Sequence, residues 1–441
     1  MNLVGIGSFR GGVHMADRKE LTYDCAISKV PTPSRVVLPV KQHIGAPARV
    51  VVQKGDVVQK GQLIAESGGR ISANVCASVS GTVVDVSLQP HCSGRDVLAV
   101  VIETGEEQGW KTDLQPMSLA EAKPDEIISI IEKAGIVGMG GAGFPTHIKL
   151  MPPREKKIDA LVINGCECEP YLTADYRLMI EYPKEVIFGV RALAKALGVN
   201  QVFIGIEDNK PAALSALQEV NDGSLRIVPL KTKYPQGAEK QLIFSILKRE
   251  VPTGCLPMDV GVVVNNVGTA YAVWQAIARG WPLVERVVTV SGEGVARPGN
   301  YLVPLGMSVG DLIEACLGFV GQPGKVILGG PMMGIAITDL SVPVIKGTSG
   351  IVVLNRKQAR KEAVQPCIKC GRCVEVCPTF LLPSLIARFA EHDEFDSAEE
   401  YGAMNCIECG SCSFVCPAKR PLVHWIQMAK AQLSLKRQKV G

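Results

Sequence analysis

Eight of the 15 cysteines in the chain are grouped into two short runs near its C-terminal end. Both runs match the pattern C-x2-C-x2-C-x3-C-P, in which three thiolates hold one [4Fe–4S] cluster and the fourth points toward a neighbouring site. The sequence therefore predicts two [4Fe–4S] clusters that carry single electrons. The expected ligands are Cys367, Cys370, Cys373 and Cys377 in the first run and Cys406, Cys409, Cys412 and Cys416 in the second.

The fourth cysteine of each run is expected to bind the cluster of the other run, as in ferredoxins with two clusters. Cys416 would then join the first three cysteines of the first run, and Cys377 would join those of the second. The alternative is a pair of zinc sites, which usually take four ligands arranged as two pairs. The spacing favours iron–sulfur clusters, and the crossed ligation would hold them close enough for fast electron transfer.

A second candidate site is a glycine-rich loop at residues 135–149. Its glycines let the backbone approach a phosphate or a planar ring, and free N–H groups there could bind anionic oxygens. The loop lacks the Gly-Lys-Ser/Thr of a Walker motif and does not fit G-x-G-x-x-G placed directly after a strand. Taken alone, it could also be a structural turn.

This loop and three later segments resemble, in the same order, the NADH-oxidising flavoprotein subunit of respiratory complex I. The later segments are residues 164–170, 234–240 and 264–269. The resemblance implies that FMN is held by Gly138, Gly140, Gly141, Gly143, Lys149, Asn164, Glu167, Asn265, Asn266 and Thr269. It also implies that NAD(H) is faced by Phe144, Glu169 and Glu239.

The chain departs from that family at Cys166 and Cys168, which stand where the family has Asp and Ser, so the roles of both thiols stay open. Asn265 and Asn266 could also cap a turn, and Glu239 could be a solvated carboxylate on a helix. A flavin exchanges an electron pair with nicotinamide and releases electrons singly. FMN is therefore expected to join NAD(H) to the clusters, and no side chain is assigned as a catalytic acid or base.

The elements that must position these sites predict a multidomain α/β protein. Apolar strands alternate with helical patterns over residues 120–284, which indicates a parallel sheet covered on both faces and the FMN/NADH-binding domain. Residues 285–345 resemble the β-grasp unit that follows the flavin domain in the complex I flavoprotein. Residues 355–441, with a helical pattern between the cysteine runs, resemble an α-helical ferredoxin domain. The loop at 329–334, Gly-Gly-Pro-Met-Met-Gly, receives no chemistry from the sequence.

Residues 1–110 differ from the rest in their short strands and turn dipeptides. They resemble the barrel-sandwich fold of lipoyl and biotinyl carrier domains, but residues 74–78, where the carrier hairpin would lie, contain no acceptor lysine. We therefore expect a docking domain rather than a swinging arm. Cys76 and Cys92 lack the spacing of metal ligands relative to the nearby histidines, so buried thiols are favoured over a metal site.

The composition argues against nucleic acid as a partner, because the net charge of +4 gives no strongly basic face. No apolar run is long enough to cross a membrane and no secretory signal is visible, which predicts a cytoplasmic chain. The final helical pattern carries Lys430, Lys436, Arg437 and Lys439. It could contact an anionic membrane or a partner, although a solvated helix is the default.

The order of these parts, together with the start Arg10-Gly-Gly-Val-His14 and residues 42–47, resembles the RnfC proteins of the Rnf complexes across nearly the whole chain. The resemblance implies a peripheral subunit at the cytoplasmic face of the cell membrane. Its complex would couple electron exchange between ferredoxin and NAD(H) to sodium or proton transport. Its partners would be integral-membrane and flavoprotein subunits of the same complex.

Two alternative functions remain at this point. The cobalamin reductases of diol-degrading microcompartments share the flavin and ferredoxin parts, but that family begins with the glycine-rich domain, unlike this chain. The other alternative is an electron relay that keeps the clusters and has lost the flavin and nucleotide site. The direction of electron flow and the coupling ion stay open.

Overall fold

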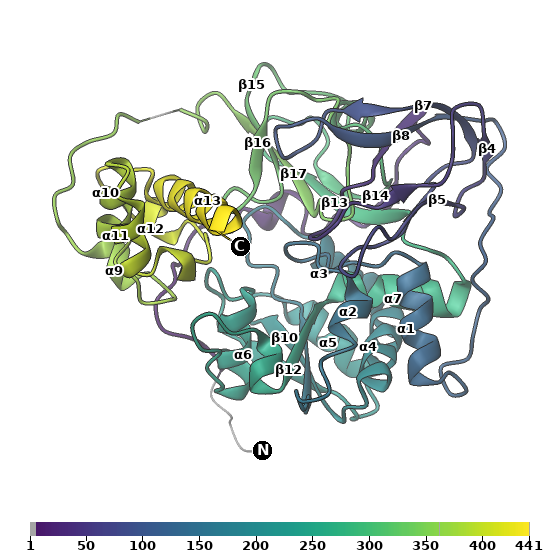
Figure 1. Cartoon of the computed structure of the whole chain (residues 1–441), viewed down its shortest axis with the longest axis horizontal. Helices are drawn as coiled ribbons and strands as arrows, with labels where there is room; N and C mark the ends of the chain where they lie inside the picture. Colours follow the sequence, from purple (N-terminus) through teal and green to yellow (C-terminus); the bar gives the residue numbers. More distant parts are fainter. Residues whose placement is uncertain (1–5, 361, 441) are drawn as a thin grey trace.

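The structure, a computed structural model, describes residues 6–360 and 362–440, with side chains up to residue 437. Along the chain these residues form a small β domain, an α/β domain, a second β-rich domain and a helical domain (Figure 1). The predicted multidomain α/β organisation is therefore present. The predicted C-terminal helix is also formed, as α13 (Leu422–Val440), while the side chain of Lys439 lies outside the described part.

The α/β domain contains a four-stranded sheet whose strands are all parallel. In spatial order the strands are β11 (Arg226–Leu230), β10 (Gln201–Glu207), β9 (Ala160–Asn164) and β12 (Val262–Asn266). One face packs against α1 (Pro124–Lys133), α4 (Pro183–Leu197), α5 (Pro211–Val220) and α7 (Val267–Arg279), and the other against α6 (Glu239–Leu247). Leu161 and Ile163 belong to the first core and Val162 to the second, since successive side chains point to opposite faces.

The second β-rich domain is built on a six-stranded sheet and the helix α8 (Val309–Ala315). Its strands in spatial order are β1 (Ile27–Lys29), β14 (Gly299–Pro304), β13 (Glu285–Ser291), β17 (Gly350–Asn355), β15 (Pro323–Leu328) and β16 (Ile335–Ile337). The sheet thus takes one strand from the N-terminal segment and one from beyond residue 345. Both pair with partners far away in sequence, so no local pattern could place them in this domain.

The small β domain consists of a four-stranded and a three-stranded antiparallel sheet. The strands of the larger sheet are β2 (Arg35–Pro39), β8 (Val97–Thr104), β7 (Gly81–Gln89) and β4 (Val57–Val58). Those of the smaller sheet are β3 (Arg49–Val50), β5 (Leu63–Glu66) and β6 (Val75–Cys76). The segment at 74–78 is not an exposed hairpin tip, because Cys76 is buried and the carbonyl of Asn74 accepts a bond from Lys346. This placement suits a docking domain.

The helical domain contains α10 (Pro383–Glu391), α11 (Phe395–Glu400), η3 (Ala403–Asn405) and α13 around a small apolar core. Each cysteine run leads into a short helix, α9 (Arg372–Glu375) or α12 (Ser411–Phe414). Both short helices begin after a glycine with a φ of +76°, Gly371 in the first run and Gly410 in the second. The two runs therefore have matching backbones at this turn.

The N-terminal segment before β2 lies outside the small β domain and contacts three other regions. Gly7 forms a bridge with Leu230 at the edge of the parallel sheet, and Val13 pairs with Tyr234. The amide of Gly12 donates to the carbonyl of Val376 in the helical domain at 2.8 Å. A side chain on Gly12 would come within 2.6 Å of the Tyr234 carbonyl, which explains why this strap contains glycine.

Lys346 joins three domains through a fully buried ammonium group. Its Nζ donates to the carbonyl of Asn74 in the small β domain and to that of Gly135 in the α/β domain at 2.7 Å. Burial lowers the pKa of Lys346 to about 8. Removing this side chain would leave two buried carbonyl groups without their donor.

We expect Lys346→Met to lower the free energy of unfolding by roughly 2–4 kcal/mol, because each unsatisfied buried acceptor costs about 1–3 kcal/mol. Thermal unfolding of the apoprotein measures this loss. Between pH 8 and 10.5 the unfolded lysine binds more protons than the folded one, so this group makes the wild-type protein more stable as pH rises through that window. The variant should lack that contribution, and an unchanged pH dependence would contradict the assignment.

Candidate cofactor sites

The predicted flavin residues meet where two neighbouring parallel strands end. Asn164 at the end of β9 is in register with Asn266 at the end of β12. Carboxyl ends of parallel strands are the usual binding edge of open α/β sheets. The glycine-rich loop and the first turn of α7 close over this edge, because the amide of Met139 donates to Oγ1 of Thr269 at 3.0 Å.

The glycine-rich loop is a narrow turn whose two arms are bonded to each other. The amide of Gly138 donates to the carbonyl of Phe144 at 2.9 Å. Gly143 has a φ of +71°, in the left-handed region that glycine adopts without strain. A Cβ on Gly140 would lie 2.8 Å from Nδ2 of Asn266, whereas no described atom lies within 4 Å of a Cβ on Gly141. Gly140 thus permits packing against the chain itself, and Gly141 presents open backbone.

Asn265 is the residue that most clearly requires a ligand. Its side chain is 3% exposed, yet within the described part of the chain neither its oxygen nor its nitrogen has a hydrogen-bond partner. A buried amide left unpaired is costly, and nearly all such groups in folded proteins are satisfied. The amide therefore fits a bound molecule with its own donors and acceptors, as FMN is. Lys149 lies nearby on α2 (Thr146–Lys149), with Nζ 3.4 Å from Oε1 of Glu239.

Asn266 is engaged with the chain rather than free for a ligand. Its Oδ1 accepts the amide of Gly268 and caps α7, and its Nδ2 donates to Oδ2 of Asp175 at 2.7 Å. Burial, followed by the charge of Glu167, raises the pKa of Asp175 to about 7. Sequence reasoning missed Asp175, which follows the 164–170 segment on α3 (Ala174–Glu181) with no spacing that marks it. It places a carboxyl group that titrates near neutral pH at the flavin edge.

The two glutamates of the 164–170 segment also bond within the protein. The carboxylate of Glu167 accepts the amides of Asp175 and Tyr176 at the start of α3. That of Glu169 accepts the amides of Met332 and Met333 at 3.0 and 2.9 Å. The loop at 329–334, to which the sequence assigned no chemistry, is therefore docked on a residue expected to face NAD(H).

A buried lysine that the sequence did not reveal holds this segment in shape. Nζ of Lys19 donates to the carbonyls of Glu167, Glu169 and Leu172. Burial lowers the pKa of Lys19, with the charge of Glu167 acting in the opposite direction. The donor comes from the N-terminal strap, so its role depends on a contact that no local sequence pattern indicates.

Cys166 and Cys168 differ in their surroundings. Cys166 is fully buried in the core beneath α6, and burial raises its pKa, which describes an inert structural thiol. Sγ of Cys168 accepts the amide of Gly237 at 3.3 Å, so this thiol packs the 164–170 segment against the 234–240 turn. Asn164 supports the same contact, because its Nδ2 donates to the Gly237 carbonyl at 2.8 Å.

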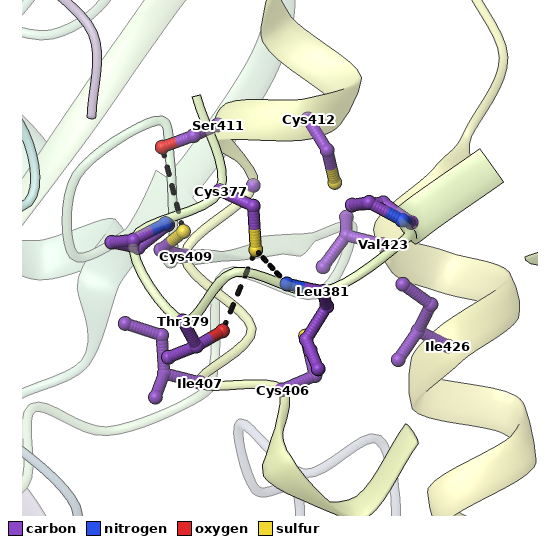
Figure 2. Close-up of a pocket in the computed structure, with 13 residues that line it drawn as sticks. Cys377, Thr379, Leu381, Cys406, Ile407, Cys409, Ser411, Cys412, Val423 and Ile426 are labelled. Carbon is purple, nitrogen blue, oxygen red and sulfur yellow. Dashed lines mark hydrogen bonds between the residues drawn. The ribbon is translucent and has the colours of Figure 1, made fainter. Parts of the chain in front are cut away.

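The eight clustered cysteines surround two pockets in the helical domain, and each pocket draws its thiols from both runs. The inner site is lined by Cys377, Cys406, Cys409 and Cys412 (Figure 2). The outer site is lined by Cys367, Cys370, Cys373 and Cys416. This is the crossed grouping that the spacing predicts, and four converging thiols are the ligand set of a [4Fe–4S] cluster.

The inner site is the more enclosed of the two. Cys377, Cys409 and Cys412 are each 7% exposed, whereas Cys367 and Cys370 are exposed. Burial raises the pKa of Cys412 to about 12, so this thiol keeps its proton until iron displaces it.

The inner site also faces the α/β domain. Tyr234, buried in the turn at 234–240, donates from its hydroxyl to the carbonyl of Cys409 at 2.8 Å. Nε2 of Gln241 on α6 donates to the carbonyl of Pro378 at 3.1 Å. Cys168, Tyr234, Met332 and Cys409 belong to one apolar cluster. The flavin edge, the inner site and the exposed outer site therefore follow one another in space.

Family models match all four regions of the chain. They are the RnfC barrel sandwich hybrid domain at residues 7–107, the Nuo51 FMN-binding domain at 131–275, the SLBB domain at 287–336 and the 4Fe-4S dicluster domain at 358–418. The RnfC protein of the proton-translocating ferredoxin:NAD(+) oxidoreductase complex of Clostridium ljungdahlii is 49% identical over 96% of this chain and 94% of its own length. The chain belongs to the RnfC family.

Other RnfC proteins are similar over comparable lengths. That of the Na(+)-translocating complex of Acetobacterium woodii is 46% identical over 98% of both chains. That of the ion-translocating oxidoreductase complex of Rhodobacter capsulatus is 45% identical over 97% of this chain and 83% of its own length. Relatives of both the proton- and the Na(+)-translocating kind are thus similarly close, which leaves the coupling ion open.

Among solved structures, the fold resembles a chain of the NAD+-reducing [NiFe]-hydrogenase in its H2-reduced state. The likeness has a TM-score of 0.54 at 23% identity and covers 73% of this chain and 65% of that chain. At this identity the likeness concerns the fold alone.

Membership of the RnfC family decides between the functions left open by the sequence. The N-terminal match to the RnfC barrel sandwich and the near full-length relatives exclude a cobalamin reductase. The matched FMN-binding and dicluster domains make FMN and two [4Fe–4S] clusters the cofactors of this RnfC protein, in agreement with the prediction. Within the described residues, no helix of this protein is long and apolar enough to cross a membrane.

Proposed function

We propose that the chain is the NAD(H)-facing electron-transfer subunit of an ion-translocating ferredoxin:NAD oxidoreductase complex. The observation that carries the proposal is the linear order of its sites. The flavin edge contacts the inner site through Tyr234, and the outer site opens to the surface. Electrons would pass between NAD(H), FMN, the inner cluster and the outer cluster.

The side chains at the flavin edge would divide the work of binding FMN. Asn265 would pair with the flavin through its unsatisfied amide, and Gly141 would let the ring or phosphate approach the backbone. Asn266, Glu167 and Asn164 would act by shaping the edge, since their polar groups already bond to the chain. A bound FMN supplies the exchange between hydride transfer and single-electron transfer.

The remaining assignments concern the ligands and NAD(H). The inner and outer sites would each bind one [4Fe–4S] cluster through their four thiolates. Phe144, Glu169 and Glu239 would face the nucleotide. Glu169 has both carboxylate oxygens bonded to the loop at 329–334, so binding of NAD(H) against Glu169 would displace that loop.

The outer site supports the proposed place of the chain in its complex. Ile368, between two cysteines of the outer site, is 68% exposed, which suits a surface covered by a redox partner. The partners would be integral-membrane and flavoprotein subunits, with ferredoxin as the distant electron partner. The chain would lie on the cytoplasmic face of the membrane and reach it through these subunits.

The test is an anaerobic titration of the cluster-reconstituted protein with NADH, with and without added FMN, followed by absorbance and electron paramagnetic resonance. We expect NADH to bleach the flavin band and then to produce a reduced-cluster signal only when FMN is present. If dithionite reduces the clusters while NADH does nothing with FMN present, the chain is a relay and the proposal is wrong.

Asn265→Leu is the sharpest variant for the flavin part of this proposal. The leucine removes an unpaired buried amide, so the apoprotein should be as stable as wild type or more stable by about 1–3 kcal/mol. FMN binding should nevertheless weaken by at least about tenfold, since the ligand loses its amide partner. Thermal unfolding and fluorescence titration with FMN measure the two effects. Equal weakening of both stability and binding would point to a structural role for Asn265 instead.

A further inference from the structure

We propose that the hydroxyl groups of Thr379 and Ser411 selectively raise the reduction potential of the inner cluster. Oγ1 of Thr379 lies 3.4 Å from Sγ of Cys377, and Oγ of Ser411 lies 3.4 Å from Sγ of Cys409. Figure 2 shows both hydroxyl groups beside their thiols at the inner pocket. The two residues are positioning residues, because they act on the cluster through its cysteine ligands.

The two cysteine runs are near copies in backbone, so the outer site provides an internal comparison. Lys369 and Glu408, which each lie between the first two cysteines of a run, have φ values of 55° and 58°. The glycine at the following turn has a φ of +76° in both runs. Residues at corresponding places in the two runs therefore have corresponding relations to their cysteines.

At both places where the inner site has a hydroxyl group, the outer site has none. Ser411 follows Cys409-Gly, and its counterpart after Cys370-Gly is Arg372. Thr379 follows Cys377-Pro, and its counterpart after Cys416-Pro is Ala418. Because the ligation is crossed, Thr379 belongs to the first run in sequence but bonds at the inner site together with Ser411. The pairing of these two hydroxyl groups on one site is visible only in the folded chain.

Deprotonation of the ligands decides which partner donates. A cysteine that binds iron has lost its proton, so only the hydroxyl group can donate in the contacts of Thr379 and Ser411. An added electron increases the negative charge shared by the cluster and its sulfurs. Hydrogen bonds to charged acceptors are stronger than those to neutral ones, and bonds to the sulfurs are one of the factors that set cluster potentials. Both hydroxyl groups therefore favour the reduced state.

Burial acts in the opposite direction and gives the two hydroxyl groups a purpose. The inner site is enclosed, and removal from water penalises the more highly charged reduced state. The outer site is exposed and has Lys369 and Arg372 beside its cysteines, so water and cations stabilise its reduced state. Thr379 and Ser411 offset the penalty at the inner site, which keeps the inner potential near that of the outer cluster.

The inference rests on the proposed ligand sets. The test is a redox titration, monitored by electron paramagnetic resonance, of the full chain reconstituted with both clusters. Thr379→Val and Ser411→Ala should each lower one of the two midpoint potentials, the same one, and leave the other unchanged. The expected effect of each is roughly a tenfold change in the ratio of oxidised to reduced cluster at a given potential, about 59 mV for one electron.

Two further variants separate potential tuning from a structural role. Thr379→Ser keeps the hydroxyl group and should restore the wild-type potential, while Ala418→Thr adds a hydroxyl group at the outer site and should raise only the other potential. Unchanged potentials, or a shift of both potentials together in Thr379→Val, would overturn the inference. Iron and sulfide contents below those of two clusters in the wild-type protein would instead overturn the proposed ligands, and the inference with them.

Discussion

Cys377→Ala should abolish the inner cluster and leave the outer cluster intact, although Cys377 belongs to the same sequence run as the outer ligands. The reason is that its thiol lines the pocket formed by Cys406, Cys409 and Cys412. Iron and sulfide should fall to about half of the wild-type content. Reduction of the remaining cluster by NADH should be lost even with FMN bound, because the inner cluster lies between the flavin edge and the outer site.

Double variants test the crossed ligation without any assumption about potentials. Cys377→Ala combined with Cys409→Ala should retain about half of the iron, since both residues serve one cluster. Cys377→Ala combined with Cys370→Ala should lose nearly all of it, since these residues serve different clusters. Chemical iron and sulfide analysis measures the contents. The reverse pattern would show that each run binds its own cluster.

Gly141→Ala should weaken FMN binding by at least about tenfold while leaving the apoprotein folded as well as before. A Cβ on Gly141 meets no described atom within 4 Å, so the chain itself has room for it. Alanine there should not cost stability, because replacing an unstrained glycine typically stabilises a protein by about 0.4–1 kcal/mol. The added methyl group would occupy the backbone surface that the flavin is proposed to approach. Fluorescence titration with FMN and thermal unfolding of the apoprotein measure the two effects.

Two other glycines serve as controls for Gly141→Ala. Gly347 also has open space around its Cβ position but lies away from the flavin edge, so Gly347→Ala should change neither property. Gly140→Ala places a methyl group 2.8 Å from Nδ2 of Asn266, which caps α7 and bonds to Asp175, so it should lower both stability and FMN affinity. Wild-type FMN affinity in Gly141→Ala would exclude the proposed approach to the loop.

The residues expected to bind FMN do lie together, but the structure divides them into two kinds. Asn265 and Gly141 present unused groups, whereas Glu167, Asn164 and Asn266 are already bonded within the chain. Resemblance between motifs cannot separate these kinds, because it records which residue types recur and not which polar atoms are satisfied. That distinction depends on groups brought in from distant segments.

The sequence by itself determined the features that depend on short spacing along the chain. The two cysteine runs, the glycine-rich turn and the alternation of buried strands with amphipathic helices are local, and local geometry follows from residue type and period. These features were sufficient to indicate iron–sulfur clusters, a flavin and the order of the domains.

Only the tertiary structure decided the contacts that join these parts. The N-terminal strap places Lys19 beneath the 164–170 segment, Lys346 joins three domains, and Glu169 holds the loop at 329–334. The same is true of the two hydroxyl groups at the inner site, which come from different cysteine runs. Each contact joins residues far apart in the chain, and which of them meet is decided by the surfaces that packing buries together, a property that no local period encodes.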